Sequence, residues 1–316
     1  MRYSCLNSYP NVFVKMTGLR VAEFDALVSD VLPAFNEAEI QRLSRPNRQR
    51  EIGGGRGSEL DPRNQLLLTV IWLRVYPTHD VLGYLFGVSA ITVGRIIKRM
   101  LPLVEQAGRD TMRMPDPGKK RRRHLDDLLH DTPELAVVID SFEQKVQRPK
   151  DPNERDGFYS GKKKTHTLKS QVAVNEETGR LVDVSQSVPG PTADIKLLAQ
   201  SGLMERLPEG VGGIGDLAYV GIDQLHPQGL GASPRRKPRG KPRPPEDIVY
   251  NTAFSHRRIL VENTIGRLRR SRLLTPMTRM SLACSTVPLM NSRSPLRPSR
   301  CSLLIPAIGS RLAAAF

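Results

Sequence analysis

Three acidic side chains, remote from one another in the chain, have the chemistry needed to cut a phosphodiester bond. Asp140 ends the apolar run AVVID, Asp216 ends the glycine-rich run VGGIGD, and Glu262 lies within the arginine-rich stretch HRRILVENTIGRLRR. Cleavage by two metal ions requires several carboxylates that converge on ions about 3.5–4 Å apart. Each acid alone is more typical of a helix cap or a salt bridge, so the prediction depends on all three together.

Such a set of carboxylates predicts two bound Mg²⁺ or Mn²⁺ ions. These hard cations prefer oxygen ligands, whereas zinc sites are commonly built from Cys and His. The three cysteines, Cys5, Cys284 and Cys301, are scattered and form no CxxC pair. This distribution argues against a zinc finger or a disulfide scaffold and suits a reducing cytoplasm.

The helix predicted around Glu262 has arginines suited to binding a polyanion. Arg258 lies four residues before Glu262 and Arg269 seven residues after it, so helical geometry stacks all three on one face. One interpretation is a surface salt bridge, which contributes little to stability. The other is that Glu262 binds a metal ion while the two arginines bind the DNA phosphates on which the metal acts.

A second basic cluster lies at the start of a predicted strand. Its members are Lys162, Lys163, Lys164, His166 and Lys169. Strand alternation places Lys164 and His166 on one face and Lys169 on the other. A triple lysine is usually a solvated turn, but beside a metal site it would clamp DNA phosphates. His166 would orient a phosphate or a water; the alternative is a packed or solvent-facing histidine.

The segment DVLGYLFGVSAITVGRII predicts a helix-turn-helix. Gly87 supplies the turn and Ser89 can cap the second helix. That helix would present Arg95 to a DNA groove, with Lys98 and Arg99 nearer the phosphates. The alternative is an ordinary helical hairpin in a globular core.

Apolar periodicity divides the chain into helical and mixed parts. The first hundred or so residues have helical spacing, whereas short β-branched runs alternate with helical segments over 135–272. The mixed part predicts an α/β domain. The predicted organisation is a helical DNA-binding domain with the helix-turn-helix at about 79–100, a basic linker, a catalytic domain and an atypical tail, at residues 1–115, 116–134, 135–274 and 275–316 respectively.

The formal net charge of +16 is consistent with a nucleic-acid partner, although charge alone specifies no fold. Residues 263–316 contain nine Arg and no Asp, Glu or Lys. We hypothesise a reading-frame shift near 272–275; a natural disordered tail is the alternative. The most apolar stretch, 66–73, is too short to cross a bilayer, so we expect a cytoplasmic protein without a membrane partner.

Several blocks occur in the order found in bacterial insertion-sequence DDE transposases, in the subgroup allied with the eukaryotic Harbinger elements. They are VVIDSFEQKVQRPK, FYSGKKKTHTLKSQVAV, GDLAYVG and the arginine-rich stretch around Glu262, preceded by QLLLTVIWLRVYPTHDVLGYLFGVS. The resemblance covers roughly residues 20–272. It implies a ribonuclease-H-like catalytic core preceded by an all-α helix-turn-helix domain, with Asp140, Asp216 and Glu262 as the metal ligands.

The resemblance also implies cut-and-paste transposition by a nucleoid-associated protein. Its partners would be the terminal inverted repeats and the target DNA, bound by a homodimer or larger assembly during synapsis. Ser255 stands where the family has Tyr, and Arg269 replaces Lys without its compact ammonium geometry. Two alternatives follow: a decayed or repurposed transposase that only binds specific DNA, and a stand-alone nuclease that hydrolyses without joining.

Overall fold

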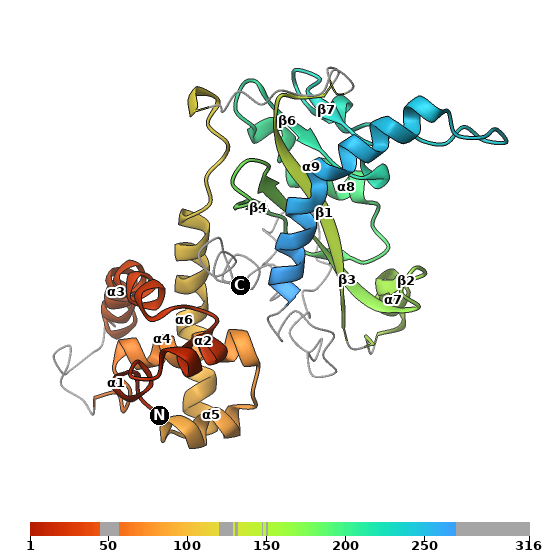
Figure 1. Ribbon diagram of the computed structural model, residues 1–316. Coiled ribbons are helices and arrows are strands. Elements are labelled where there is room, and N and C mark those ends of the chain that lie inside the picture. Colours follow the sequence, from red (N-terminus) through yellow and green to blue (C-terminus); the bar gives the residue numbers. More distant parts are fainter. Residues whose placement is uncertain (45–56, 120–128, 130–131, 147, 150, 270–316) are drawn as a thin grey trace. The chain divides into compact units, whose positions relative to one another are not determined.

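The computed structural model describes residues 1–44, 57–119, 129, 132–146, 148–149 and 151–269. These residues form two compact units, 1–111 and 112–269 (Figure 1). The predicted fold class is confirmed, because a helical unit with a helix-turn-helix precedes a mixed α/β unit consistent with a ribonuclease-H-like core. The predicted tail, and most of the predicted linker, lie outside the described residues.

Helices build the first unit as far as it is described. They are α1 (Tyr3–Leu6), α2 (Pro10–Thr17), α3 (Val21–Leu43), α4 (Pro62–Val75), α5 (His79–Phe86) and α6 (Ala90–Asp110). α4 is central: its residues 64–73 are all buried, and it contacts the five other helices. Asp61 caps α4 by accepting a hydrogen bond from the backbone N–H of Asn64 at 2.8 Å.

The predicted helix-turn-helix is present as α5 and α6. Gly87 ends α5 in the left-handed conformation (φ 70°), which glycine adopts without steric cost. Ser89 Oγ caps α6 by accepting the backbone N–H of Thr92, at 3.2 Å. At Gly83 an added Cβ would lie 2.6 Å from the carbonyl oxygen of Val88, so the two helices approach too closely for a side chain there. α6 continues about ten residues beyond the predicted end.

The second unit is organised around a seven-stranded mixed sheet. Its strands are β1 (Leu135–Lys145), β2 (Tyr159–Ser160), β3 (Thr165–Asn175), β4 (Leu181–Val184), β5 (Val188–Pro189), β6 (Val211–Ile214) and β7 (Gly231–Ala232). The order is β2-β3-β1-β6-β7, with β4 and β5 also paired with β3. β3 runs antiparallel to β1, whereas β1, β6 and β7 are parallel.

Helices cover this sheet. They are α7 (Pro152–Phe158), α8 (Asp194–Ser201) and α9 (Pro245–Arg269), with the 3₁₀ turns η1 (Pro117–Lys119), η3 (Met204–Arg206), η4 (Leu217–Tyr219) and η5 (Ile222–Leu225). Leu135, Val137 and Ile139 of β1 join an apolar cluster that includes α8. Since side chains alternate along a strand, Asp140 falls on the other face. α9 packs on β1 and β3 (Figure 1).

β3 and β4 form a hairpin, and β1 extends beyond the apolar run AVVID that Asp140 ends. β3 and β4 are antiparallel, with an irregular register between Ala173 and Val174. Asp140, however, does not end its strand: β1 continues to Lys145. The polar residues after Asp140 remain in the sheet because they pair with the long strand β3, as far as Lys145 opposite Thr167. Asp140 therefore lies within β1, opposite Val172.

Candidate active site and nucleic-acid interface

The register of two neighbouring strands places Asp140 and Asp216 at the same level of the sheet. β1 and β6 are parallel, and Val138 pairs with Ile214. Each aspartate lies two residues beyond this pair, and neighbouring strands are about 5 Å apart. Asp216 follows the end of β6 and caps η4, accepting the backbone N–H of Ala218 at 2.9 Å. The parallel pairing thus brings together two acids that are far apart in the sequence.

α9 adds the third acid through a shared arginine. Arg258 Nη2 lies 4.0 Å from Asp140 Oδ2 and 3.8 Å from Glu262 Oε1. The side chain of Arg258 is 15% exposed, whereas that of Glu262, one helical turn later, is 62% exposed. The guanidinium therefore lies close to both acids, and α9 directs Glu262 toward the same region as Asp140.

The electrostatics of Asp140 link the three acids. Burial raises the pKa of Asp140 to about 6, although the Ser141 backbone N–H and the charge of Arg258 oppose this shift. Asp216 and Glu262 raise that pKa further. Asp140 is thus a desolvated carboxyl group within range of two like charges, and a nearby cation would favour its ionised form.

A network that sequence reasoning did not identify supports Asp140 from the opposite face of β1. Ser141 donates its backbone N–H to Asp140 Oδ1 at 2.8 Å and its hydroxyl to Asp194 Oδ1 at 2.7 Å. Lys169 Nζ lies 2.8 Å from the same Asp194 oxygen and donates to the carbonyl of Thr192 at 2.6 Å. An acid in the first turn of a helix, here Asp194 in α8, is a weak sequence signal and does not name its partners.

This network corrects the role predicted for Lys169. The residue is 8% exposed, and its ammonium is already held by Asp194 and Thr192. Lys169 lies in the central part of β3, and its side chain points inward toward α8. In the sequence it groups with the exposed lysines of the turn because it lies close to them in the chain. The geometry argues against a direct contact between Lys169 and DNA phosphates.

The triple lysine is exposed but distant from the acids. Lys162, Lys163 and Lys164 form the turn between β2 and β3, where Lys164 has a positive φ of 52°. From Val172, opposite Asp140, eight residues of chain lead back to Lys164, a separation of roughly 25 Å. The lysines therefore do not flank Asp140, because β3 continues past the level of Asp140 along the polar half of β1. Their contact with DNA stays a prediction.

The remaining predicted DNA contacts differ in environment. His166 is half-buried and packs edge-on against Tyr159, with ring centroids 5.6 Å apart. Arg95 and Lys98 are exposed on α6, whereas Arg99 is paired with Glu39. Arg269 is the last residue of α9, and its side chain lies outside the described part of the chain.

A divalent cation would suit the chemistry of the three acids but not their present spacing. Among the described residues, no three His, Cys, Asp or Glu side chains lie close enough together to hold a metal ion. The donors are carboxylate oxygens, as hard cations require, and the negative charges of Asp216 and Glu262, which contribute to the raised pKa of Asp140, favour a cation there. Asp140, Asp216 and Glu262 therefore fit such an ion in charge and ligand type, with Arg258 next to two of them.

No single helix among the described residues is long and apolar enough to cross a membrane. By length and composition alone, α5 and α6 together would be, but the two helices are bent by 98° relative to each other.

Family comparisons agree with both units. Residues 139–290 match the DDE superfamily endonuclease family, and residues 58–110 match the helix-turn-helix of DDE superfamily endonuclease. The first match continues past residue 272, where we expected the resemblance to end. The matched range therefore includes residues 275–290 of the predicted tail.

A curated relative covers most of the chain. The probable transposase for insertion sequence element IS702 from Microchaete diplosiphon is 27% identical over 267 residues, which span 84% of this chain and 86% of that protein. No solved structure matches the chain. With the helix-turn-helix and the mixed sheet described above, these matches show that the chain belongs to the DDE superfamily of insertion-sequence transposases.

Proposed function

We propose that this chain is a metal-dependent DNA transposase that cleaves the ends of its element and joins them to target DNA. Membership of the family supports nuclease and transposition chemistry and binding to DNA. The observations that support the catalytic proposal most directly are geometric: Arg258 lies 4.0 Å from Asp140 and 3.8 Å from Glu262, and the register of β1 with β6 brings Asp216 beside Asp140. These acids, from β1, the segment after β6 and α9, come near one another although they are remote in sequence.

Each acid has a distinct role in this proposal. Asp140 on β1, Asp216 just after the adjacent strand β6, and Glu262 on α9 would hold two Mg²⁺ or Mn²⁺ ions. Bound ions would activate the attacking water or 3′ hydroxyl and stabilise the leaving oxygen. Arg258 would neutralise the acids before the ions bind and then face the scissile phosphate. A shift of the Arg258 side chain would leave room for the metal, since long arginine side chains rotate readily.

The DNA partners follow from the helix-turn-helix. α6 would read the terminal inverted repeats, and the active site would act at their ends and on target DNA in the bacterial cytoplasm. Pairing two ends would require at least a dimer. The sequence departures at Ser255 and Arg269 remove no metal ligand, and Ser255 is exposed, with its hydroxyl donated to the carbonyl of Thr252 at 2.7 Å.

Strand cleavage tests the proposal. The substrate is a duplex with the inverted repeats that flank the coding sequence, incubated with Mg²⁺ or with EDTA. We expect Mg²⁺-dependent nicking at the repeat end, which Glu262→Gln lowers by about 100-fold or more. Glu246→Gln, an exposed Glu-to-Gln change in the first turn of the same helix, should leave the rate unchanged. Equal rates for both variants would exclude Glu262 from catalysis.

The second candidate function is specific DNA binding without cleavage. The position of Arg258 between Asp140 and Glu262 favours it, because a fixed guanidinium there would satisfy the acids in place of a metal. Retention of repeat-specific binding without Mg²⁺-dependent nicking by the wild type would support this function. A stand-alone nuclease would nick the repeats but fail to join the freed 3′ end to a second duplex.

A further inference from the structure

A cleft lies within the first unit, between the end of α3, the start of α4 and the N-terminal half of α6. Its volume is about 820 Å³. The charged side chains that line it are Glu39, Arg42, Asp61, Arg95, Lys98 and Arg99. Four of these six side chains are cationic, so the cleft concentrates positive charge beside the helix-turn-helix.

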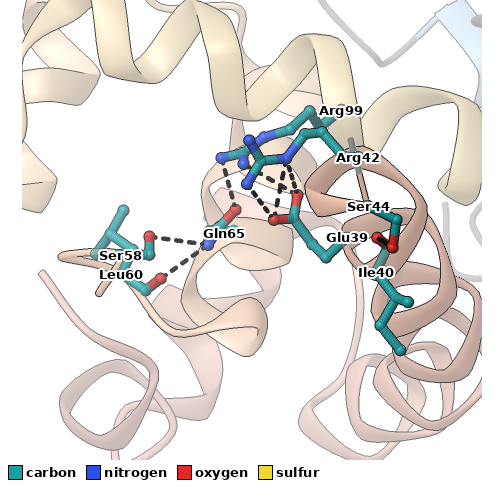
Figure 2. Close-up of polar contacts among 8 residues, drawn as sticks. All are labelled: Glu39, Ile40, Arg42, Ser44, Ser58, Leu60, Gln65 and Arg99. Atoms are coloured by element: carbon teal, nitrogen blue, oxygen red, sulfur yellow. Dashed lines mark hydrogen bonds and ion pairs between the residues drawn. The ribbon is translucent and has the colours of Figure 1, made fainter. Parts of the chain in front are cut away.

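Two of the cations are held by one carboxylate (Figure 2). Arg42 donates from Nη2 to Glu39 Oε2 at 2.6 Å and from Nε to Oε1 at 3.1 Å. Arg99, from α6, donates from Nη1 to Glu39 Oε1 at 3.1 Å. The hydrogen bonds from Arg42 and the charges of both arginines hold the pKa of Glu39 below its usual range. Glu39 is therefore an ionised anchor that joins α3 to α6 at the wall of the cleft.

A buried amide fixes the second arginine from the other side. Gln65 is 2% exposed, and its Nε2 donates to the Leu60 carbonyl at 2.8 Å and to Ser58 Oγ at 3.2 Å. Its Oε1 accepts from Arg99 Nη2 at 3.4 Å (Figure 2). The Nε of Arg99 is buried and has no partner among the described residues. The amide thus positions a guanidinium whose hydrogen-bonding capacity is not fully used.

The other two cations extend the charge along α6. Arg95 and Lys98 are exposed, and within the described residues neither forms an ion pair. The acids of the lining are Glu39 and Asp61, and Asp61 is occupied as the cap of α4. Four cations against two carboxylates leave a positive site, with the positive end of the α4 dipole next to it.

The geometry points to this cleft as a binding site for the sugar–phosphate backbone of one DNA strand, adjacent to the groove that α6 enters. The inference rests on the proposed DNA binding, and it adds α3 and the start of α4 to the surface that touches DNA. Paired arginines suit phosphate oxygens because a guanidinium can donate two parallel hydrogen bonds. Contacts of this kind fix the position of a protein on the duplex and do not read its sequence.

The salt dependence of DNA binding tests whether the cleft contacts phosphates, as distinct from basic residues elsewhere on the protein. The probe is a fluorescently labelled 30-base-pair duplex of arbitrary sequence, and Kd is measured in EDTA between 50 and 200 mM NaCl. Loss of one phosphate contact lowers the slope of log Kd against log salt by about 0.9. We expect this change for Arg42→Ala. The matched control is Arg20→Ala at the other end of α3, where Arg20 forms the same i,i+3 type of pair with Glu23. It should leave the slope unchanged.

Replacing the acid that pairs with Arg42 should change DNA affinity in the opposite direction, and the acid that pairs with Arg20 serves as its control. Glu39→Gln removes a competing carboxylate and should tighten binding and steepen the slope, while Glu23→Gln should do neither. Equal effects within either pair of variants, or no binding of the duplex by the wild type, would overturn the inference. Circular dichroism melting establishes that each variant is folded. Because the assay contains no metal and needs no cleavage, its outcome is independent of the catalytic test with Glu262→Gln.

Discussion

Arg257 and Glu176 form a buried ion pair that fastens α9 to the turn after β3. Arg257 Nε lies 2.6 Å from Glu176 Oε1, and Nη2 donates to Oε2 at 2.7 Å. The two side chains are 7% and 2% exposed. Arg257 also donates to Thr132 Oγ1 and to the Pro133 carbonyl, ahead of β1. The neighbouring Arg258 faces the candidate metal ligands, so adjacent arginines separate anchoring of the helix from the chemistry.

Removing Arg257 should destabilise the second unit strongly. Arg257→Ala leaves the Glu176 carboxylate buried without its guanidinium, at an expected cost of about 3–5 kcal/mol in the free energy of unfolding. Urea unfolding measures this loss. Arg155→Ala breaks a pair in which Asp156 is 82% exposed and should cost less than about 1 kcal/mol. Similar small losses in both variants would show that the pair does not anchor α9.

The spacing of apolar residues along α9 is a sequence signal that Arg257 is buried. Phe254, Val261, Ile265 and Leu268 are buried on α9, and helical spacing places Arg257 on the same stripe. An arginine within an apolar stripe predicts a buried, paired charge. Its partner could not be predicted, because the contact with Glu176 joins residues 81 positions apart.

Residue types and order selected Asp140, Asp216 and Glu262 as candidates, whose role as metal ligands stays a prediction, but they did not predict the surroundings of these acids. The length of β1 was not predictable, since its polar half is held by pairing with β3 instead of by apolar burial of every residue. The distance of the triple lysine from Asp140 depends on the register of β3 with β1, which pairs Asp140 with Val172. Ser141 and Asp194 meet only through the tertiary fold.

Asp140 should make stability depend on pH. Its folded-state pKa of about 6 exceeds the ordinary value of 3.8, so between these values the folded state binds more protons than the unfolded state. Stability therefore falls as pH rises from 3.8 to about 6 and stays lower above that. Asp140→Asn should be more stable than the wild type at pH 7.5, by about 1–3 kcal/mol, with a smaller difference near pH 4.5. Urea unfolding in EDTA, with Asp156→Asn as an exposed control, checks this; a pH-independent difference would contradict it.

Mg²⁺ should stabilise the wild type against unfolding through the same acids. At a concentration ten times its Kd, a ligand that binds only the folded state adds about 1.4 kcal/mol. We expect thermal unfolding to shift upward on addition of Mg²⁺ or Mn²⁺ to the wild type and Glu246→Gln, and chelation to reverse the shift. Asp140→Asn and Glu262→Gln should lose most of it. An equal shift in all four proteins would place the bound metal elsewhere.

Mutations of Lys169 and Asp194 should have non-additive effects on the free energy of unfolding, because the two side chains form an ion pair. Their side chains are 10% and 19% exposed, so Asp194→Asn would leave a mostly buried ammonium without its counter-ion, at about 3 kcal/mol. Adding Lys169→Met removes that charge and should restore much of the stability. The double-mutant cycle is measured by urea unfolding. Additive losses would indicate that the two charges do not depend on each other.

The lysine turn should contribute to DNA affinity without affecting the chemical step. The test variant is Lys162→Ala, Lys163→Ala and Lys164→Asn, because Asn tolerates the positive φ at position 164 better than Ala. For each lysine that contacts a phosphate, the salt slope of binding should fall by about 0.9. Since the turn lies roughly 25 Å along β3 from the level of Asp140, the cleavage rate at saturating DNA should match the wild type. A tenfold loss of that rate would show that the turn reaches the reacting phosphate, for example from a second copy of the chain.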